Sequence, residues 1–172
     1  MEIQPRLALS KATAIISRDR QYRYELTRHW NAKLNPLFWI MLNPSTADAR
    51  TDDPTIRRCI SLAKSWGYGS IRVYNLFALR SPHPRHIMTV DDPVGPENDR
   101  WLRSAARSRH QIIAAWGACR MPLVMQRAAR VTRLLQHERK CHPMCLGKTK
   151  TGDPKHPLYI RTDVVLETLL KT

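Results

Sequence analysis

The chain has 172 residues, 42% of them hydrophobic and 25% charged, a composition ordinary for one folded domain with a real core. It contains no run of about 18 apolar residues, which excludes a membrane-spanning helix. Lys and Arg number 29 against 14 Asp and Glu, so the formal net charge is +15; this excess favours a polyanionic partner, with nucleic acid ahead of an anionic membrane.

The first part of the chain predicts a peripheral segment followed by an edge strand. Residues 1–20 are weakly patterned, carry an early glutamate and lack a convincing cleavage site, so we expect no signal peptide. Residues 21–28 alternate and are rich in β-forming residues, which predicts an antiparallel edge strand. We therefore expect a single domain, residues 1–172, with a peripheral N-terminal segment.

One stretch after this edge strand organises the chain. The uninterrupted apolar run at residues 37–42 predicts a strand buried on both faces. Asn43 and Pro44 end this strand, and a polar loop with three aspartates follows. Asp53 then precedes a proline, as an N-cap precedes the first helical position, so we expect a helix at residues 54–66.

Strands and helices alternate in the rest of the chain. The patterns predict a strand at residues 70–77, a long polar segment, a helix from Pro96, a strand at 111–116, a helix at 121–135, a strand at 143–146 and a final helix capped by Asp163. Such alternation predicts an α/β fold of three layers, α/β/α, around a central, mainly parallel four-stranded sheet, with the N-terminal antiparallel edge strand beside it.

Two further patterns favour their simpler interpretations. Three arginines, Arg127, Arg130 and Arg133, recur at three-residue spacing, which is more typical of a solvated helix face than of a binding surface. The four cysteines are Cys59, Cys119, Cys141 and Cys145. No second close pair completes a metal site, so we expect reduced thiols in a cytoplasmic protein rather than an iron–sulfur cluster.

Polar residues follow each predicted parallel strand, and the carboxyl ends of parallel strands lie at one edge of a sheet. The residues that this rule brings together are Asn43, Pro44, Ser45, Asp48, Asp52, Asp53, Asn75, Arg80, His83, His86, Gly117, Lys148, Lys150 and His156. Carboxylate, amide, imidazole and cationic groups in one place suit the activation of water beside an anion. Some have simpler roles: Asp53 is first of all an N-cap, and Asp48 and Asp52 suit Asx-turns equally well.

Several of these motifs resemble an uncharacterised bacterial family, domain of unknown function 1643. The motifs are MLNPSTAD at 41–48, TDDPT at 51–55 with two arginines after it, NLFALR at 75–80, GPEND at 95–99, AWGA at 115–118 and HPLY at 156–159. The resemblance covers residues 37–159, nearly the whole domain. This family carries no established activity, so it implies a fold and a set of shared residues rather than a reaction.

The order of motifs is also similar to the uracil-DNA glycosylase superfamily, which implies a glycosylase-like fold. In several branches of that superfamily an Asn-Pro after the first strand positions the hydrolytic water, and a late His-Pro contacts the substrate. The resemblance implies that Asn43 positions water, aided by Asp48 or Asp52, and that His156 steadies charge on the departing base. The substrate-binding residues would be Pro44, Ser45, Asn75, Arg80, Gly117, Lys148 and Lys150, with no metal or cofactor.

Three functions follow from these patterns. The leading hypothesis is hydrolysis of an N-glycosidic bond in DNA or in a related nucleotide, with DNA favoured as the partner and no membrane. The first alternative is a non-catalytic nucleic-acid-binding module that keeps the fold. The Asp-rich loop is foreign to the glycosylase pattern, so the second alternative is a nucleotide or sugar hydrolase or transferase that uses Asp48, Asp52 and Asp53 around Mg²⁺.

Overall fold

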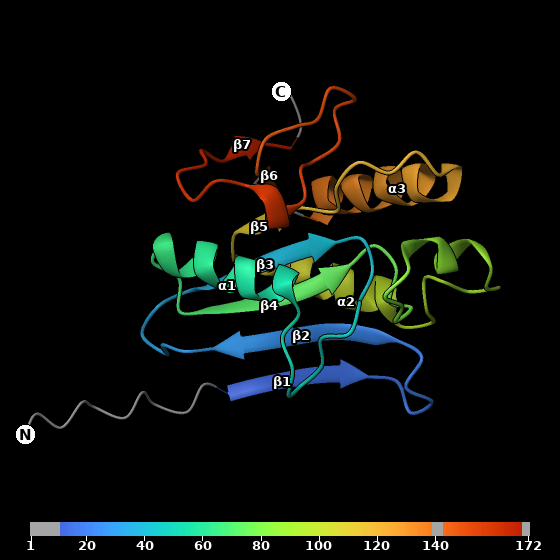
Figure 1. The fold of residues 1–172 in the computed structure, drawn as a ribbon, viewed down its shortest axis with the longest axis horizontal. Helices are drawn as coiled ribbons and strands as arrows, with labels where there is room; N and C mark the ends of the chain where they lie inside the picture. Colours follow the sequence, from blue (N-terminus) through green and yellow to red (C-terminus); the bar gives the residue numbers. More distant parts are fainter. Residues whose placement is uncertain (1–10, 139–142, 170–172) are drawn as a thin grey trace, which may run out of the picture.

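A seven-stranded sheet with helices against both faces forms the fold, which a computed structural model describes over residues 11–138 and 143–169 (Figure 1). The strands are β1 (Lys11–Ile16), β2 (Arg23–His29), β3 (Pro36–Met41), β4 (Ser70–Asn75), β5 (Ile112–Ala114), β6 (Met144–Cys145) and β7 (Glu167–Thr168). The α-helices are α1 (Pro54–Ser65), α2 (Asn98–Arg107) and α3 (Pro122–Glu138), and two short 3₁₀ helices are η1 (Pro84–Met88) and η2 (Pro157–Tyr159).

Strand β3 lies at the middle of the sheet and is buried on both faces, as its apolar run predicts. Its side chains alternate, so that Leu37, Trp39 and Met41 belong to one apolar cluster and Phe38 and Ile40 to another. The first cluster includes the buried side of α1, and the second includes the buried sides of α2 and α3. The two clusters therefore separate the molecule into helix, sheet and helix layers.

The sheet is mixed, with strand order β1-β2-β4-β3-β5-β6-β7. Strand β3 pairs in parallel with β4 and β5, and β5 pairs in parallel with β6. The pairs β1–β2, β2–β4 and β6–β7 are antiparallel. The predicted mainly parallel sheet of four strands with one antiparallel edge strand is therefore not confirmed, because antiparallel strands extend the sheet at both ends.

The N-terminal part of the chain differs from the prediction, because it forms a β-hairpin. Strand β1 lies within the segment predicted to be peripheral, and it covers β2, which was predicted to be the edge. The turn between them is closed by the backbone N–H of Ser17, which donates to the carbonyl oxygen of Tyr22 (3.0 Å). Asp19 accepts from Ser17 Oγ and from the backbone N–H of Gln21 inside the same turn. This local turn chemistry supplies a second strand that satisfies the outer hydrogen-bonding groups of β2.

The predicted final helix is wrong. Residues after Asp163 form an extended segment, and β7 pairs antiparallel with β6. The backbone N–H of Leu169 donates to the carbonyl oxygen of Pro143 (2.8 Å), and the Leu169 side chain packs into the α2–α3 cluster. Pairing with the otherwise open edge of β6 thus prevails over the helical spacing of a short apolar run. Within the described residues, no helix has the length and apolar character needed to cross a membrane.

Candidate functional site

The strand order reverses at β3, and this reversal defines where a site can form. The chain leaves β3, crosses through α1 and returns as β4 on one side of it; after α2 it returns as β5 on the other side. Helix α1, which follows β3, and helix α3, which follows β5, lie on opposite faces of the sheet, so the loops at the carboxyl ends of β3 and β5 diverge. Open α/β sheets bind ligands in the crevice that such a reversal leaves.

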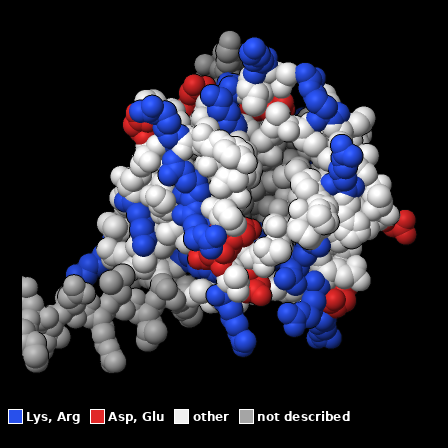
Figure 2. Space-filling model, in the orientation of Figure 1, with Lys and Arg blue, Asp and Glu red and all other residues white. Residues whose placement is uncertain are grey.

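A pocket of about 200 Å³ lies at this place. It is lined by Arg23, Met41, Leu42, Asn43, Ser45, Asp53, Thr55, Ile56, Ser81, Pro82, Pro84, Trp116 and His156. Figure 2 shows that the α1 face of the molecule is hollowed, with Lys and Arg side chains spread around the hollow. The pocket residues come from the ends of β3, β4 and β5, from the start of α1, from β2 and from the late loop before η2.

The Asn43 side chain is held by two main-chain carbonyl groups. Its Nδ2 donates to the carbonyl oxygens of Pro44 (3.1 Å) and Ser81 (2.9 Å). The backbone N–H of Ser81 in turn donates to the carbonyl oxygen of Pro44 (2.8 Å), so the loops after β3 and β4 are tied together. Because both amide protons have acceptors, Oδ1 is the atom of this amide that can accept a hydrogen bond from a molecule in the pocket.

His156 presents a neutral imidazole to the pocket. Its Nδ1 accepts from the backbone N–H of Leu158 (3.3 Å), which assigns the remaining proton of the neutral ring to Nε2. Burial lowers the pKa of His156 below its ordinary value, and the negative charge of Asp53 partly opposes this shift. Gly117 has a φ of +76°, and a Cβ built there would stand 3.3 Å from the His156 Cβ. The neutral ring can therefore donate a hydrogen bond from Nε2 to a molecule in the pocket.

Asp53 and Arg23 supply opposite charges to the pocket. Asp53 Oδ1 accepts from the backbone N–H of Ile56 (2.8 Å), which confirms its predicted role as the N-cap of α1. The Arg23 guanidinium, almost fully buried, donates to the carbonyl oxygen of Ala47 (2.8 Å) and to Asn75 Oδ1 (3.2 Å). Burial lowers the pKa of Arg23 to about 10, while Asp53 acts against that shift, so the side chain remains charged at neutral pH.

The other two predicted aspartates shape the loop and do not line the pocket. Asp48 Oδ1 accepts from the backbone N–H groups of Arg50 (2.8 Å) and Thr51 (3.0 Å), an arrangement that lowers the pKa of Asp48. Asp52 forms an ion pair with the buried Arg28 (2.7 Å), whose guanidinium also donates to the carbonyl oxygen of Asp48 (2.5 Å). The loop is thus clamped to β2 by an arginine.

The remaining predicted substrate-binding residues lie around the pocket rather than in its wall. Asn75 is buried and accepts from Arg23, and the Arg80 guanidinium donates to the carbonyl oxygen of Arg20 (3.2 Å). Lys148 pairs through its backbone with Pro154, and Lys150 is exposed in the same loop. Of the predicted site residues, only Asn43, Ser45, Asp53 and His156 line the pocket directly.

Arg23 is the functional candidate that sequence reasoning missed. It stands in an alternating strand, where a charged residue between two tyrosines indicates a solvent-facing position. The structure instead covers both faces of β2, and the guanidinium reaches the loop after β3. The alternation carries no signal for this burial. Ser81, Pro82 and Pro84 were likewise not among the predicted site residues, and they also line the pocket.

Cysteines and metal ligands lie apart from this pocket. Cys59 and Cys145 are buried free thiols, and Cys119 is a partly exposed one; Cys141 lies outside the described residues. Burial raises the pKa of both Cys59 and Cys145. Within residues 11–138 and 143–169, no group of three or more His, Cys, Asp or Glu side chains is arranged to hold a metal ion.

Comparison with known proteins identifies a family. No curated protein and no solved structure matches the chain, so the similarity to the uracil-DNA glycosylase superfamily stays a prediction. The family model described as "Protein of unknown function (DUF1643)" matches residues 23–158. The match begins at the buried Arg23 and ends inside η2, so it includes every side chain that lines the pocket. The chain therefore belongs to the DUF1643 family, as the sequence motifs predict.

Proposed function

We propose that this protein hydrolyses an N-glycosidic bond in nucleic acid, with a fold and site of the uracil-DNA glycosylase type. One observation carries the proposal: Asn43 and His156, which come from distant parts of the chain, line the same pocket with complementary hydrogen-bonding atoms. Asn43 offers an acceptor to a water molecule, and His156 offers a donor to a base. The parallel strands β4, β3, β5 and β6 supply the edge on which these groups meet.

The size of the pocket favours a single base as the group that enters it. Its volume of about 200 Å³ is below the roughly 300–1,000 Å³ of ordinary small-molecule sites. Apolar side chains give it walls suited to a planar ring, and they are Trp116, Met41, Leu42, Ile56, Pro82 and Pro84. A base turned out of its stack into this pocket would leave its sugar and phosphates at the mouth, where the surface is rich in Lys and Arg (Figure 2).

The reaction follows from the polar groups. The oxygen of a water held by Asn43 Oδ1 and by the Asp53 carboxylate forms a bond to C1′ of the sugar as the C1′–N bond breaks. The base leaves with the bonding electron pair, and the Nε2–H of His156 stabilises the negative charge that develops on it. One proton of the water ends on the base and the hydroxyl stays on C1′, so the products are a free base and an abasic sugar. The positive charge of Arg23 partly offsets the negative charge of Asp53.

The compartment that we propose is the cytoplasm. The three described cysteines are free thiols, and two of them are buried where they pack as small apolar groups. Structural disulfides are rare in the reducing cytosol, whereas secreted domains commonly use them.

An excision assay on oligonucleotides tests this function. Substrates carry uracil, hypoxanthine, xanthine or a mismatch in single- and double-stranded form, and heat with alkali reveals abasic sites. We expect excision by the wild type and a loss of about 10²–10⁴-fold in Asn43→Ala, the range for a group that assists proton transfer or charge development. Asn31→Ala is the control. Asn31 Oδ1 accepts from the backbone N–H of Lys33 in an exposed turn, and Asn31 does not line the pocket. Equal activity of the two variants would refute the role of Asn43.

A second pair of variants separates chemistry from folding. Asp53→Asn keeps a side chain that caps α1 well but removes the carboxylate from the pocket. Asp52→Asn removes the neighbouring carboxylate, which pairs with Arg28 outside the pocket. We expect excision to fall in Asp53→Asn and to persist in Asp52→Asn. Salt-dependent retention of the oligonucleotide without any product from the wild type would instead favour the non-catalytic binding module.

A further inference from the structure

A groove between α2 and α3 lies on the face of the sheet opposite α1. It consists of two adjoining hollows of about 430 and 440 Å³ that share Asp99, Arg130 and Arg133 in their walls. Along α3 the groove runs from Leu123 to Glu138, which is about 22 Å at the helical rise of 1.5 Å per residue. We call it the α2–α3 groove. It shares no lining residue with the pocket of about 200 Å³ at the carboxyl ends of the strands, which we call the strand-end pocket.

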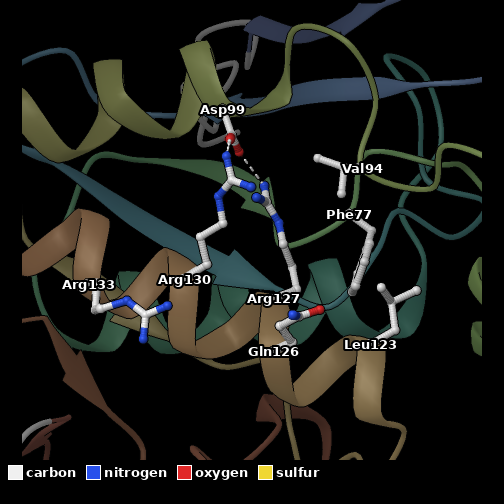
Figure 3. Close-up of a pocket in the computed structure, with 8 residues that line it drawn as sticks. All are labelled: Phe77, Val94, Asp99, Leu123, Gln126, Arg127, Arg130 and Arg133. Carbon is white, nitrogen blue, oxygen red and sulfur yellow. Dashed lines mark hydrogen bonds and ion pairs between the residues drawn. The ribbon is translucent and has the colours of Figure 1, made fainter.

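The two ends of the α2–α3 groove differ in chemistry (Figure 3). Phe77, Val94 and Leu123 gather at one end and form an apolar wall. Three arginines of α3 occupy the other part: Arg127, Arg130 and Arg133. Arg103 of α2 lines the continuation of the groove, so that four guanidinium groups border it.

Carboxylates balance only part of this charge. Asp99 binds two of the four arginines, through Arg127 (2.6 Å) and Arg130 (3.0 Å). Glu138, at the far end, is engaged by Arg107 through two hydrogen bonds (2.9 and 3.3 Å). Arg103 and Arg133 have no ion pair with any residue that the structure describes. The groove therefore keeps an excess of positive charge that its own side chains do not neutralise.

Two of the four arginines, Arg127 and Arg130, are also held in place by protein partners, which distinguishes them from a solvated stripe. Arg127 is 5% exposed, and its Nε donates to the carbonyl oxygen of Leu76 (2.8 Å) while Nη2 binds Asp99. Asp99 then holds Arg130 against the same site. Because these side chains are already ordered, an anion that binds them loses less side-chain entropy on complex formation. Arg127 is thus buried where a solvated face was expected, whereas Arg130 and Arg133 are exposed as expected.

We propose that the α2–α3 groove binds the phosphodiester backbone of a nucleic-acid strand. Guanidinium groups match phosphate oxygens in planar, two-pronged hydrogen bonds. Arg103 and Arg133 line the groove and form no ion pair within the described residues, so their donors can make such bonds. A groove of about 22 Å spans several phosphates, since a strand carries one per roughly 3.4 Å of helix axis. This proposal goes beyond base excision and needs only binding, so it stands or falls independently of the reaction.

Salt-dependent binding of a fluorescent 20-nucleotide strand, followed by anisotropy, tests the groove. The test variant is Arg103→Gln with Arg133→Gln, which leaves the Asp99 network intact. The control is Arg18→Gln with Arg161→Gln, which removes the same charge from exposed positions elsewhere. Two lost phosphate contacts reduce the magnitude of the slope of log K against log salt by about 1.4 for a single strand, whereas the control stays within about 0.5 of the wild type.

Three outcomes would overturn the proposal. A slope of the groove variant within about 0.5 of the wild-type slope would place the bound strand elsewhere. No binding of the strand by the wild type at 50 mM salt, combined with binding of a polyglutamate peptide that the groove variant loses, would indicate an acidic protein partner. Weakened binding in both double variants alike would show a general effect of net charge. Because the assay involves no turnover, failure of base excision would leave its result unchanged.

Discussion

The strand-end pocket and the α2–α3 groove are built in opposite ways. The pocket collects single groups from loops far apart in the chain, and main-chain groups hold them: Asn43 by two carbonyl oxygens and His156 by one N–H. The groove collects like charges from two helices that pack together, and one carboxylate, Asp99, holds them. The first arrangement positions few atoms accurately, as chemistry requires; the second concentrates charge over a length, as binding of a polyanion requires.

The largest expected effect separates structure from binding inside the groove. Arg127 and Arg130 share Asp99, but Arg127 is buried and Arg130 is 65% exposed in its side chain. Arg127→Ala also leaves the buried carbonyl oxygen of Leu76 without this donor, so we expect it to lower the free energy of unfolding by about 3 kcal/mol. Arg130→Ala should cost less than about 1 kcal/mol.

Urea denaturation of both variants measures this difference, and strand binding provides the second readout. We expect Arg130→Ala to fold like the wild type and to bind the strand more weakly. Equal losses of stability in the two variants would mean that the groove is structural throughout, and the contrast with the pocket would disappear.

The pocket and the groove also differ in how far they can be predicted from the sequence. The pocket follows from one rule, that polar residues after parallel strands converge, and this rule correctly brought Asn43 and His156 together. The N-cap of Asp53 followed from the proline after it. The groove needed tertiary information, because spacing of three residues places arginines on one helix face without saying whether α2 covers it.

The errors have a common physical origin in pairing between segments. Alternation in β2 indicates two faces but not which neighbour covers them, so the burial of Arg23 could not be predicted. Asp48 and Asp52 were expected in the site, but Arg28 clamps their loop outside the pocket from a strand that local patterns do not connect to it. The final segment was expected to be helical from its apolar spacing, but the open edge of β6 takes it as β7. In each case a long-range partner decides the outcome.

A pair of glycines tests whether the pocket depends on accurate placement. Gly117 and Gly67 both have positive φ, +76° and +79°, so alanine at either position costs about 1–2 kcal/mol of backbone strain. At Gly117 the new methyl group also meets the His156 Cβ at 3.3 Å, whereas at Gly67 nothing lies within 4 Å. We expect both variants to lose similar stability, and only Gly117→Ala to lose excision, by about 10–100-fold.

Thermal unfolding and excision under the same conditions measure the two quantities. Excision that falls equally in Gly117→Ala and Gly67→Ala would show that general destabilisation, rather than displacement of His156, explains the loss. Strand binding through the groove should be unchanged in both variants, because neither glycine lines the α2–α3 groove.

The smallest expected effect is a difference in pH dependence between the two regions. Burial lowers the pKa of His156, so the folded protein holds this proton less tightly than the unfolded chain, whose histidine titrates near 6.5. The contribution of His156 to stability is therefore fully present above pH 6.5 and is lost as pH falls through the folded pKa. The stability difference between wild type and His156→Gln should follow this course in urea titrations from pH 5 to 8.

The rate of excision should depend on the same protonation of His156, because the proposed hydrogen-bond donor is the neutral ring. We expect a constant rate from pH 8 down to 6.5 and a decrease only below it. A guanidinium group does not titrate near neutral pH. Strand binding should therefore not change from pH 8 to 5 in a His137→Gln background, which removes the histidine that lines the groove. A rate that already falls by half between pH 8 and 7 would contradict a partly buried, neutral His156. Binding that follows the same curve would mean that the pocket and the groove act as one site.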